Sequence, residues 1–114
     1  MESKKILEIA VHAADSRKAE EIVALDVQKV SLLADYFLIM HANSKRQINA
    51  IVEEIIEKEE EAGVKIKRVE GQKSGRWVLI DMGDVVVHVF QTEERAFYNL
   101  EKLWADALPV KLEF

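Results

Sequence analysis

The sequence contains no cysteine, a single proline and only four glycines in 114 residues. The absence of cysteine excludes a disulfide framework, a thiol nucleophile and cysteine-ligated zinc or iron–sulfur centres. So little glycine and proline excludes collagen-like and low-complexity linker architectures. No stretch approaches the roughly 20 apolar residues of a membrane span, and the N-terminus lacks the apolar region of a signal peptide. We therefore expect one cytoplasmic domain that spans residues 1–114.

Positive charge is also in deficit, since 16 Lys and Arg oppose 21 Asp and Glu for a net charge of −5. An acidic chain binds nucleic acid poorly, because phosphate contacts depend on Lys and Arg. The imbalance favours a basic protein partner instead. Residues 65–76 are the exception, with five cations and one Glu directly before Trp77. This segment is either an RNA contact, with Lys73 and Arg76 as candidate cations, or the solvated edge of a sheet.

Three segments have the apolar spacing of amphipathic helices. The first covers residues 4–18 and has a narrow, alanine-rich inner stripe. The second begins after Asn43 or Ser44, either of which can cap it, and ends at Gly63. The third has Thr92 as its predicted cap, and its buried stripe is Phe97, Leu100, Leu103, Trp104 and Ala107.

About five further segments are predicted strands, at residues 21–27, 36–40, 64–66, 77–81 and 85–90. A three-residue connection joins the last two, which should form an antiparallel hairpin. Three helices and about five strands in this order predict an α/β domain. Its single mixed sheet should pack in two layers, which leaves much of one sheet face open.

The open face should carry the best candidate binding residues. Val78 and Ile80 are wholly apolar and should face the helices, so Trp77 and Asp81 should face outward, as should His88 by the same alternation. Tyr98 neighbours the buried stripe of the closing helix. An exposed Trp and Tyr beside a basic loop are typical of interface anchors. The alternative is a half-buried Trp covered by the loop.

Signatures of catalysis and metal binding are missing. The three histidines lie in separate predicted elements without metal-ligand spacing, and no glycine motif for phosphate binding is present. Asp26, Asp35 and Asp81 fall at predicted strand ends. They are the candidate ligands of a small metal-dependent nucleotidyltransferase or phosphodiesterase, although no compact Asp-x-Asp pair is present. We predict no catalytic residues, no metal and no cofactor, and keep this enzyme as the alternative.

Several motifs, in order along the chain, resemble the ribosomal silencing factor family, which is also called Iojap-like. They are Leu25-Asp26-Val27, Ser31-x-x-x-Asp35-Tyr36-Phe37, Ser44-x-Arg46-Gln47, Glu70-Gly71, Trp77-Val78-Leu79-Ile80-Asp81-x-Gly83-Asp84-Val85-Val86-Val87-His88 and Arg95-x-Phe97-Tyr98-x-Leu100-Glu101-x-Leu103-Trp104. The resemblance covers about residues 4–107 and leaves residues 108–114 as a short tail.

The resemblance implies a nucleotidyltransferase-like fold that does not catalyse. It implies binding to the large (50S) ribosomal subunit at a protein of the uL-fourteen family, which blocks joining of the small (30S) subunit and represses translation when nutrients are scarce. Trp77 and Tyr98 would then bury apolar area against the ribosomal protein. Asp81 and Asp84 would pair with its cations, and His88 would add a polar contact. A role in large-subunit biogenesis and a homodimer both stay open.

Overall fold

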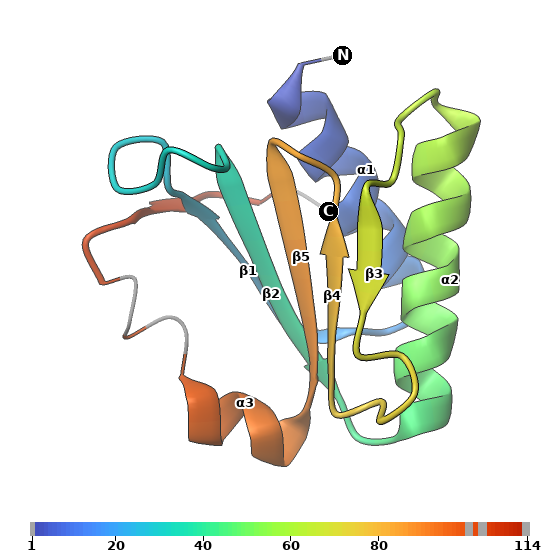
Figure 1. Ribbon diagram of the computed structural model, residues 1–114. Helices are drawn as coiled ribbons and strands as arrows, with labels where there is room; N and C mark the ends of the chain where they lie inside the picture. Colours follow the sequence, from blue (N-terminus) through green and yellow to red (C-terminus); the bar gives the residue numbers. More distant parts are fainter. Residues whose placement is uncertain (1, 100–101, 103–104, 113–114) are drawn as a thin grey trace.

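The computed structural model describes residues 2–99, 102 and 105–112. Within them, three helices and six strands follow in the order α1 (Ser3–Ser16), β1 (Glu20–Asp26), β2 (Tyr36–Ala42), α2 (Lys45–Glu61), β3 (Arg68–Glu70), β4 (Trp77–Asp81), β5 (Val85–Gln91), α3 (Thr92–Tyr98) and β6 (Leu108–Val110). The strands form one sheet in the order β3-β4-β5-β2-β1-β6 (Figure 1). β2 and β5 run parallel and the other neighbouring pairs run antiparallel. The predicted α/β class with a single mixed sheet is confirmed.

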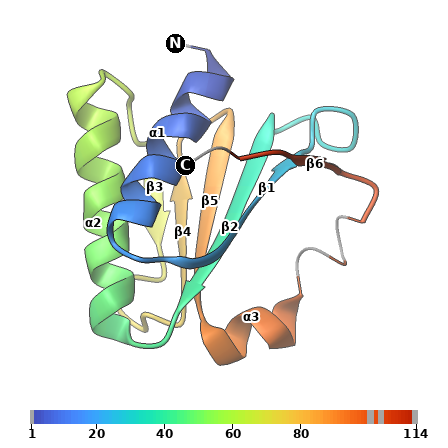
Figure 2. The ribbon, with the colours of Figure 1, turned by 180° about the vertical axis from the view of Figure 1, so that it is seen from behind.

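The helices α1 and α2 pack side by side on one face of the sheet, as both views of the ribbon show (Figures 1 and 2). The apolar stripe of α2 is fully buried at Ile48, Ile51 and Ile55. Of the two candidate caps, Ser44 is the one used, because its Oγ accepts a hydrogen bond from the Gln47 N–H at 3.1 Å. These contacts explain why helical spacing alone located α2 correctly.

The predicted alternation along the β4–β5 hairpin is also confirmed. Val78 and Ile80 are completely buried in the core beneath α1 and α2. Trp77 belongs to a second apolar cluster on the opposite face, together with Phe37 and Phe90. The sheet therefore has an apolar core on both faces, but only one of them lies under α1 and α2.

The closing part of the chain differs from prediction in two ways. Residues 108–114 were expected to be a tail, yet Leu108–Val110 pair antiparallel with β1 as a sixth strand (Figure 2). β6 is an edge strand, where Pro109 is tolerated because a missing N–H need not break a ladder. The predicted single closing helix is also interrupted, since α3 ends at Tyr98 and Asn99 adopts a left-handed conformation with φ 45°. Leu100, Leu103, Trp104 and the side chain of Phe97 lie outside what the structure describes, whereas Ala107 is buried as predicted.

Two local predictions are wrong for identifiable reasons. The predicted strand at residues 64–66 begins instead at Arg68, because the Val64 N–H continues the last turn of α2 by donating to the Glu59 carbonyl at 2.9 Å. Thr92 is not a helix cap; Gln91 occupies that position. The Thr92 hydroxyl lies 2.6 Å from Asn43 Oδ1 and so connects α3 to the end of β2. In the described part of the chain, no helix is long and apolar enough to cross a membrane.

Candidate partner-binding surface

Five aromatic rings lie together on the sheet face opposite α1 and α2. We call this set the aromatic cluster; it comprises Phe37, Trp77, His88, Phe90 and Tyr98. The register of β4 and β5 places Trp77 directly opposite Phe90, with ring centroids 5.0 Å apart. Tyr98 comes from α3, and its ring centroid is 4.6 Å from that of Trp77. Because Tyr98 is 43% exposed, the cluster reaches the protein surface.

His88 holds the indole ring of Trp77. The Trp77 Nε1–H donates a hydrogen bond to His88 Nδ1 at 3.1 Å. Burial lowers the pKa of His88 to about 4, so the imidazole is neutral near pH 7 and its Nδ1 can accept this bond. The sequence predicts His88 as a direct contact to a partner, and in the free protein this side chain is only 6% exposed. Its visible role here is to orient the indole of Trp77.

The loop before β4 packs tightly on the same residue. Gly71 has a φ of +85°, and a Cβ at this position would collide with the Trp77 carbonyl oxygen. The loop therefore requires glycine for both its conformation and its close approach to the strand. Trp77 is half-buried. Its ring packs on Phe90 and Tyr98, and part of the residue stays accessible to solvent, so both sequence-based interpretations hold in part.

The two acidic candidates, Asp81 and Asp84, differ in whether their carboxylates already have partners within the protein. Asp81 Oδ1 accepts the Gly83 N–H at 2.9 Å, and its Oδ2 lies 3.4 Å from Arg68 Nε. Its charge is thus engaged within the protein, where it stabilises the β4–β5 turn. Asp84 is exposed, and its backbone carbonyl accepts N–H bonds from Asp35 and Tyr36. The carboxylate of Asp84 therefore projects from a fixed backbone.

The predicted site residues form a strip along the sheet and not a single pocket. Trp77 and Asp81 begin and end β4, which at about 3.4 Å per residue separates them by roughly 14 Å. Lys73 and Arg76 are exposed in the loop at the Trp77 end. Lys45 of α2 joins them, since its Nζ donates to the Lys73 carbonyl at 2.6 Å. Sequence reasoning missed Lys45, because nothing local connects it to a loop so distant in sequence.

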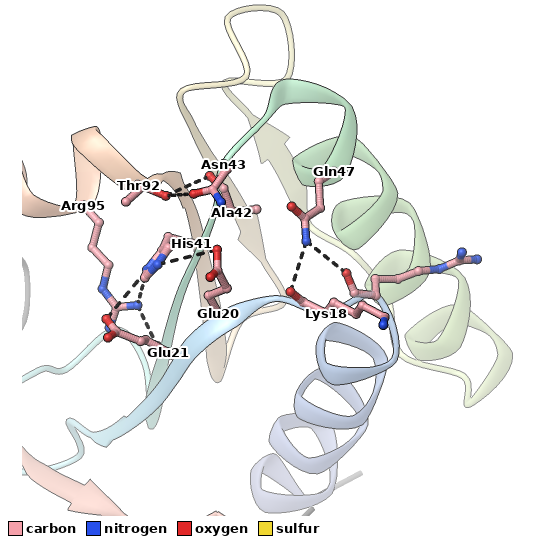
Figure 3. Close-up of polar contacts among 10 residues, drawn as sticks. Lys18, Glu20, Glu21, His41, Ala42, Asn43, Gln47, Thr92 and Arg95 are labelled. Atoms are coloured by element: carbon pink, nitrogen blue, oxygen red, sulfur yellow. Dashed lines mark hydrogen bonds and ion pairs between the residues drawn. The ribbon is translucent and has the colours of Figure 1, made fainter.

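A polar cluster around the buried His41 and Arg95, whose contacts were also missed from the sequence, attaches α3 to the sheet (Figure 3). Arg95 Nη1 donates to the Glu21 carbonyl at 2.6 Å and lies 3.0 Å from His41 Nδ1. Glu20 and Glu21 each place a carboxylate oxygen 4.0 Å from the His41 ring. Arg95 is only 8% exposed. By fixing α3, these contacts also fix where Tyr98 meets Trp77.

Two of the three carboxylates of the enzyme alternative, those of Asp26 and Asp81, lie far apart, and Asp35 directly precedes β2 between their strands. Asp26 lies on β1 and Asp81 on β4, at the same end of the sheet but with β2 and β5 between them. Three inter-strand spacings separate them by roughly 14 Å, whereas two-metal chemistry needs ions about 4 Å apart. Among residues 2–99, 102 and 105–112, no group of three His, Asp or Glu is arranged to hold a metal ion. The geometry therefore does not favour this alternative.

Comparison with known proteins agrees with the motif resemblance. Residues 1–114 match the sequence model of the family described as "Ribosomal silencing factor during starvation". The chain is 54% identical over 114 residues to "Ribosomal silencing factor RsfS" of Bacillus subtilis, covering 100% of this chain and 97% of that one. It is 27% identical over 101 residues to "Mitochondrial assembly of ribosomal large subunit protein 1" of Mus musculus, covering 86% of this chain and 44% of that protein. A crystal structure of a Chromobacterium violaceum protein superposes with a TM-score of 0.90 at 38% identity, over 100% of this chain and 92% of that one.

Proposed function

Because the chain belongs to the ribosomal silencing factor family, we propose that it binds the large ribosomal subunit in the bacterial cytoplasm and represses translation under nutrient limitation. The proposed docking partner is a protein of the uL-fourteen family on the face that joins the small subunit. A bound copy would occupy that face and block joining sterically. The protein acts by binding, without catalysis.

The aromatic cluster is the observation that carries this proposal. Large, rigid aromatic side chains that are already packed on one another lose little conformational entropy on binding, and they dominate protein–protein hot spots. Trp77 is held by His88 and flanked by Tyr98, so it is oriented before any partner arrives. The net charge of −5 favours a basic ribosomal protein.

Each proposed contact has a different physical role. Trp77 and Tyr98 bury apolar area against the ribosomal protein. Asp84 pairs with a Lys or Arg of the partner, and Asp81 adds a second carboxylate whose present neighbour, Arg68, is itself 61% exposed and can move aside. His88 contributes indirectly by orienting Trp77.

A secondary contact to ribosomal RNA is proposed at the basic loop. Lys73 and Arg76 are exposed, and Lys45 lies against the same loop. In the part of the chain that the structure describes, none of these three cations has a carboxylate within 4.0 Å. Cations without carboxylate neighbours can pair with phosphates, and such contacts weaken steeply with salt.

A sedimentation experiment with purified subunits tests the proposal. The protein should migrate with large subunits and should lower the yield of joined ribosomes when small subunits are added. Trp77→Ala should weaken binding about 30-fold, as loss of a central aromatic anchor does. Glu57→Gln changes an exposed residue of α2 in the layer away from the aromatic cluster, and it should behave like the parent. A protein that stays at the top of the gradient while joining proceeds normally would refute the proposal.

A role in assembling the large subunit is a second candidate, favoured by the name of the Mus musculus relative. Cells that lack the protein should then accumulate immature large subunits during growth in rich medium. A silencing role alone predicts normal subunit profiles there and altered ones only in starvation.

A further inference from the structure

The loop between β1 and β2 exposes two consecutive leucines. Leu32 is 103% exposed and Leu33 is 89% exposed, the highest values among the large apolar side chains that the structure describes. This loop projects beyond the sheet at the end opposite α3 (Figure 1). Two leucines wholly in water forgo the apolar burial that normally stabilises such side chains. We call residues 30–33 the leucine finger.

The base of the finger is anchored although its tip is exposed. Val27 and Ala34 are buried in the same apolar cluster that contains Phe90 and packs against Trp77. The N–H groups of Val30 and Ser31 both donate to the Val27 carbonyl, at 3.0 and 2.8 Å. A loop organised in this way loses little entropy when its tip enters a pocket.

Further hydrogen bonds fix the tip and both ends of the loop. The Leu33 N–H donates to Ser31 Oγ at 3.1 Å, and the Val27 N–H donates to the Asp35 carbonyl at 2.9 Å. The Gln28 N–H donates to Asp26 Oδ1 at 3.0 Å. The two leucines therefore project from a defined turn.

Acidic residues outnumber cations at the base of the finger. Asp26 and Asp106 line a groove there with Val30, Leu108 and the cation Lys29. Asp35 ends the loop, and its N–H donates to the carbonyl of the exposed Asp84 at 2.7 Å. These acidic residues form an acidic rim at the base of the apolar tip, which complements an apolar pocket rimmed by Lys or Arg.

We propose that Leu32 and Leu33 insert into an apolar pocket of the same basic ribosomal protein that the aromatic cluster contacts, as a second anchor at the far end of the sheet face. This inference rests on the proposed function. Continuity supports it, because the finger base and Trp77 belong to one apolar cluster. A second copy of this chain is a less suitable partner for the finger than the basic ribosomal protein. A two-fold contact between two fingers would bring their acidic rims together, and these would repel each other.

The test compares binding of four proteins to purified Bacillus subtilis large subunits: the parent, the double variant Leu32→Ser/Leu33→Ser, the double variant Leu32→Met/Leu33→Met, and Trp77→Ala. The serine variant should bind at least about 30-fold more weakly than the parent. The methionine variant should bind like the parent, because it keeps apolar volume at both positions. Neither substitution should shift the melting temperature by more than about 2 °C, since both side chains are exposed.

The outcomes separate the two proposals. If the serine variant binds like the parent while Trp77→Ala does not, the finger is not an anchor and the proposed function stands. If the parent does not bind large subunits, the proposed function fails and the inference fails with it. Sedimentation equilibrium of the free proteins adds a third outcome. A parent dimer that the serine variant converts to a monomer, with unchanged subunit binding, would assign the finger to self-association and overturn the inference.

Discussion

Raising the pH from 6.5 to 8.5 should destabilise the fold by roughly 1.5 kcal/mol, because Glu59 must ionise in the core. Glu59 follows Ile55 by one helical turn on the inner stripe of α2 and is 0% exposed. Neither of its carboxylate oxygens has a hydrogen-bond partner among the described residues. Burial raises the pKa of Glu59 from 4.5 to about 8. Between those values the folded protein holds a proton that the unfolded chain has released, so stability falls as pH rises.

The titration of His88 changes the stability of the fold in the opposite direction, at lower pH. Burial lowers the pKa of His88 from 6.5 to about 4. Between these values the unfolded chain binds a proton that the folded protein excludes, so this contribution to stability is lost as pH falls. One pH unit inside either window corresponds to about 1.4 kcal/mol. The two effects therefore nearly cancel from about pH 4.5 to 6.5, and the Glu59 effect prevails above pH 6.5.

Urea unfolding followed by circular dichroism, at one-unit steps from pH 4.5 to 8.5, measures this profile. The parent should show a plateau and then the fall above pH 6.5. Glu59→Gln removes the acid, so only the His88 effect remains and stability should rise by roughly 2.5 kcal/mol across the range. Glu57→Gln, an exposed position on the same helix, should keep the parent profile. Equal profiles for the parent and Glu59→Gln would show that Glu59 is solvated or paired, and would refute the reasoning.

Three further substitutions test local contacts by urea unfolding. Ser44→Ala should lower the free energy of unfolding by about 1 kcal/mol, because it removes the cap of α2. If it lowers stability no more than Glu57→Gln does, the capping role is contradicted. Gly71→Ala should lower the free energy of unfolding by more than about 1 kcal/mol, because the φ of +85° and the close approach of the Trp77 carbonyl both disfavour a side chain. If stability and tryptophan emission stay unchanged, the loop does not pack on Trp77 in this way. Arg95→Met should lower the free energy of unfolding by about 1–3 kcal/mol, because it removes the charged donor of the hydrogen bond to the Glu21 carbonyl. It should also speed amide hydrogen exchange in α3, and unaltered exchange would mean that other contacts hold this helix.

The elements predicted correctly are those encoded by local periodicity. The stripe of α2 and the cap at Ser44 lie within a few residues of each other, so no distant contact is needed to locate that helix. Alternation along β4 placed Val78 under the helices and Trp77 on the other face for the same reason. Alternation also placed His88 on the face of Trp77. It does not report depth, and only the structure shows that His88 is buried and accepts a hydrogen bond from the Trp77 indole.

The contacts that sequence reasoning missed join residues that lie far apart along the chain. Arg95 binds the Glu21 carbonyl 74 positions away, and Lys45 reaches a loop 28 positions away. The sequence also does not reveal that the leucine finger projects, because composition cannot distinguish a turn that folds inward from one that extends into solvent. The family motifs include Ser31 and Asp35 at the edges of this loop, yet they do not indicate where the leucines between them point.

The sequence by itself determined the class of fold, the location of α2, the facing of β4 and the family, because each depends on residue order and short-range spacing. Tertiary structure alone decided that Leu108–Val110 complete the sheet, since a three-residue strand containing proline acquires its identity only from the edge of β1. It also decided that Glu59 is sealed in the core and that Leu32 and Leu33 are not. Burial is a property of what surrounds a side chain, and those surroundings are assembled from segments that are distant in the sequence.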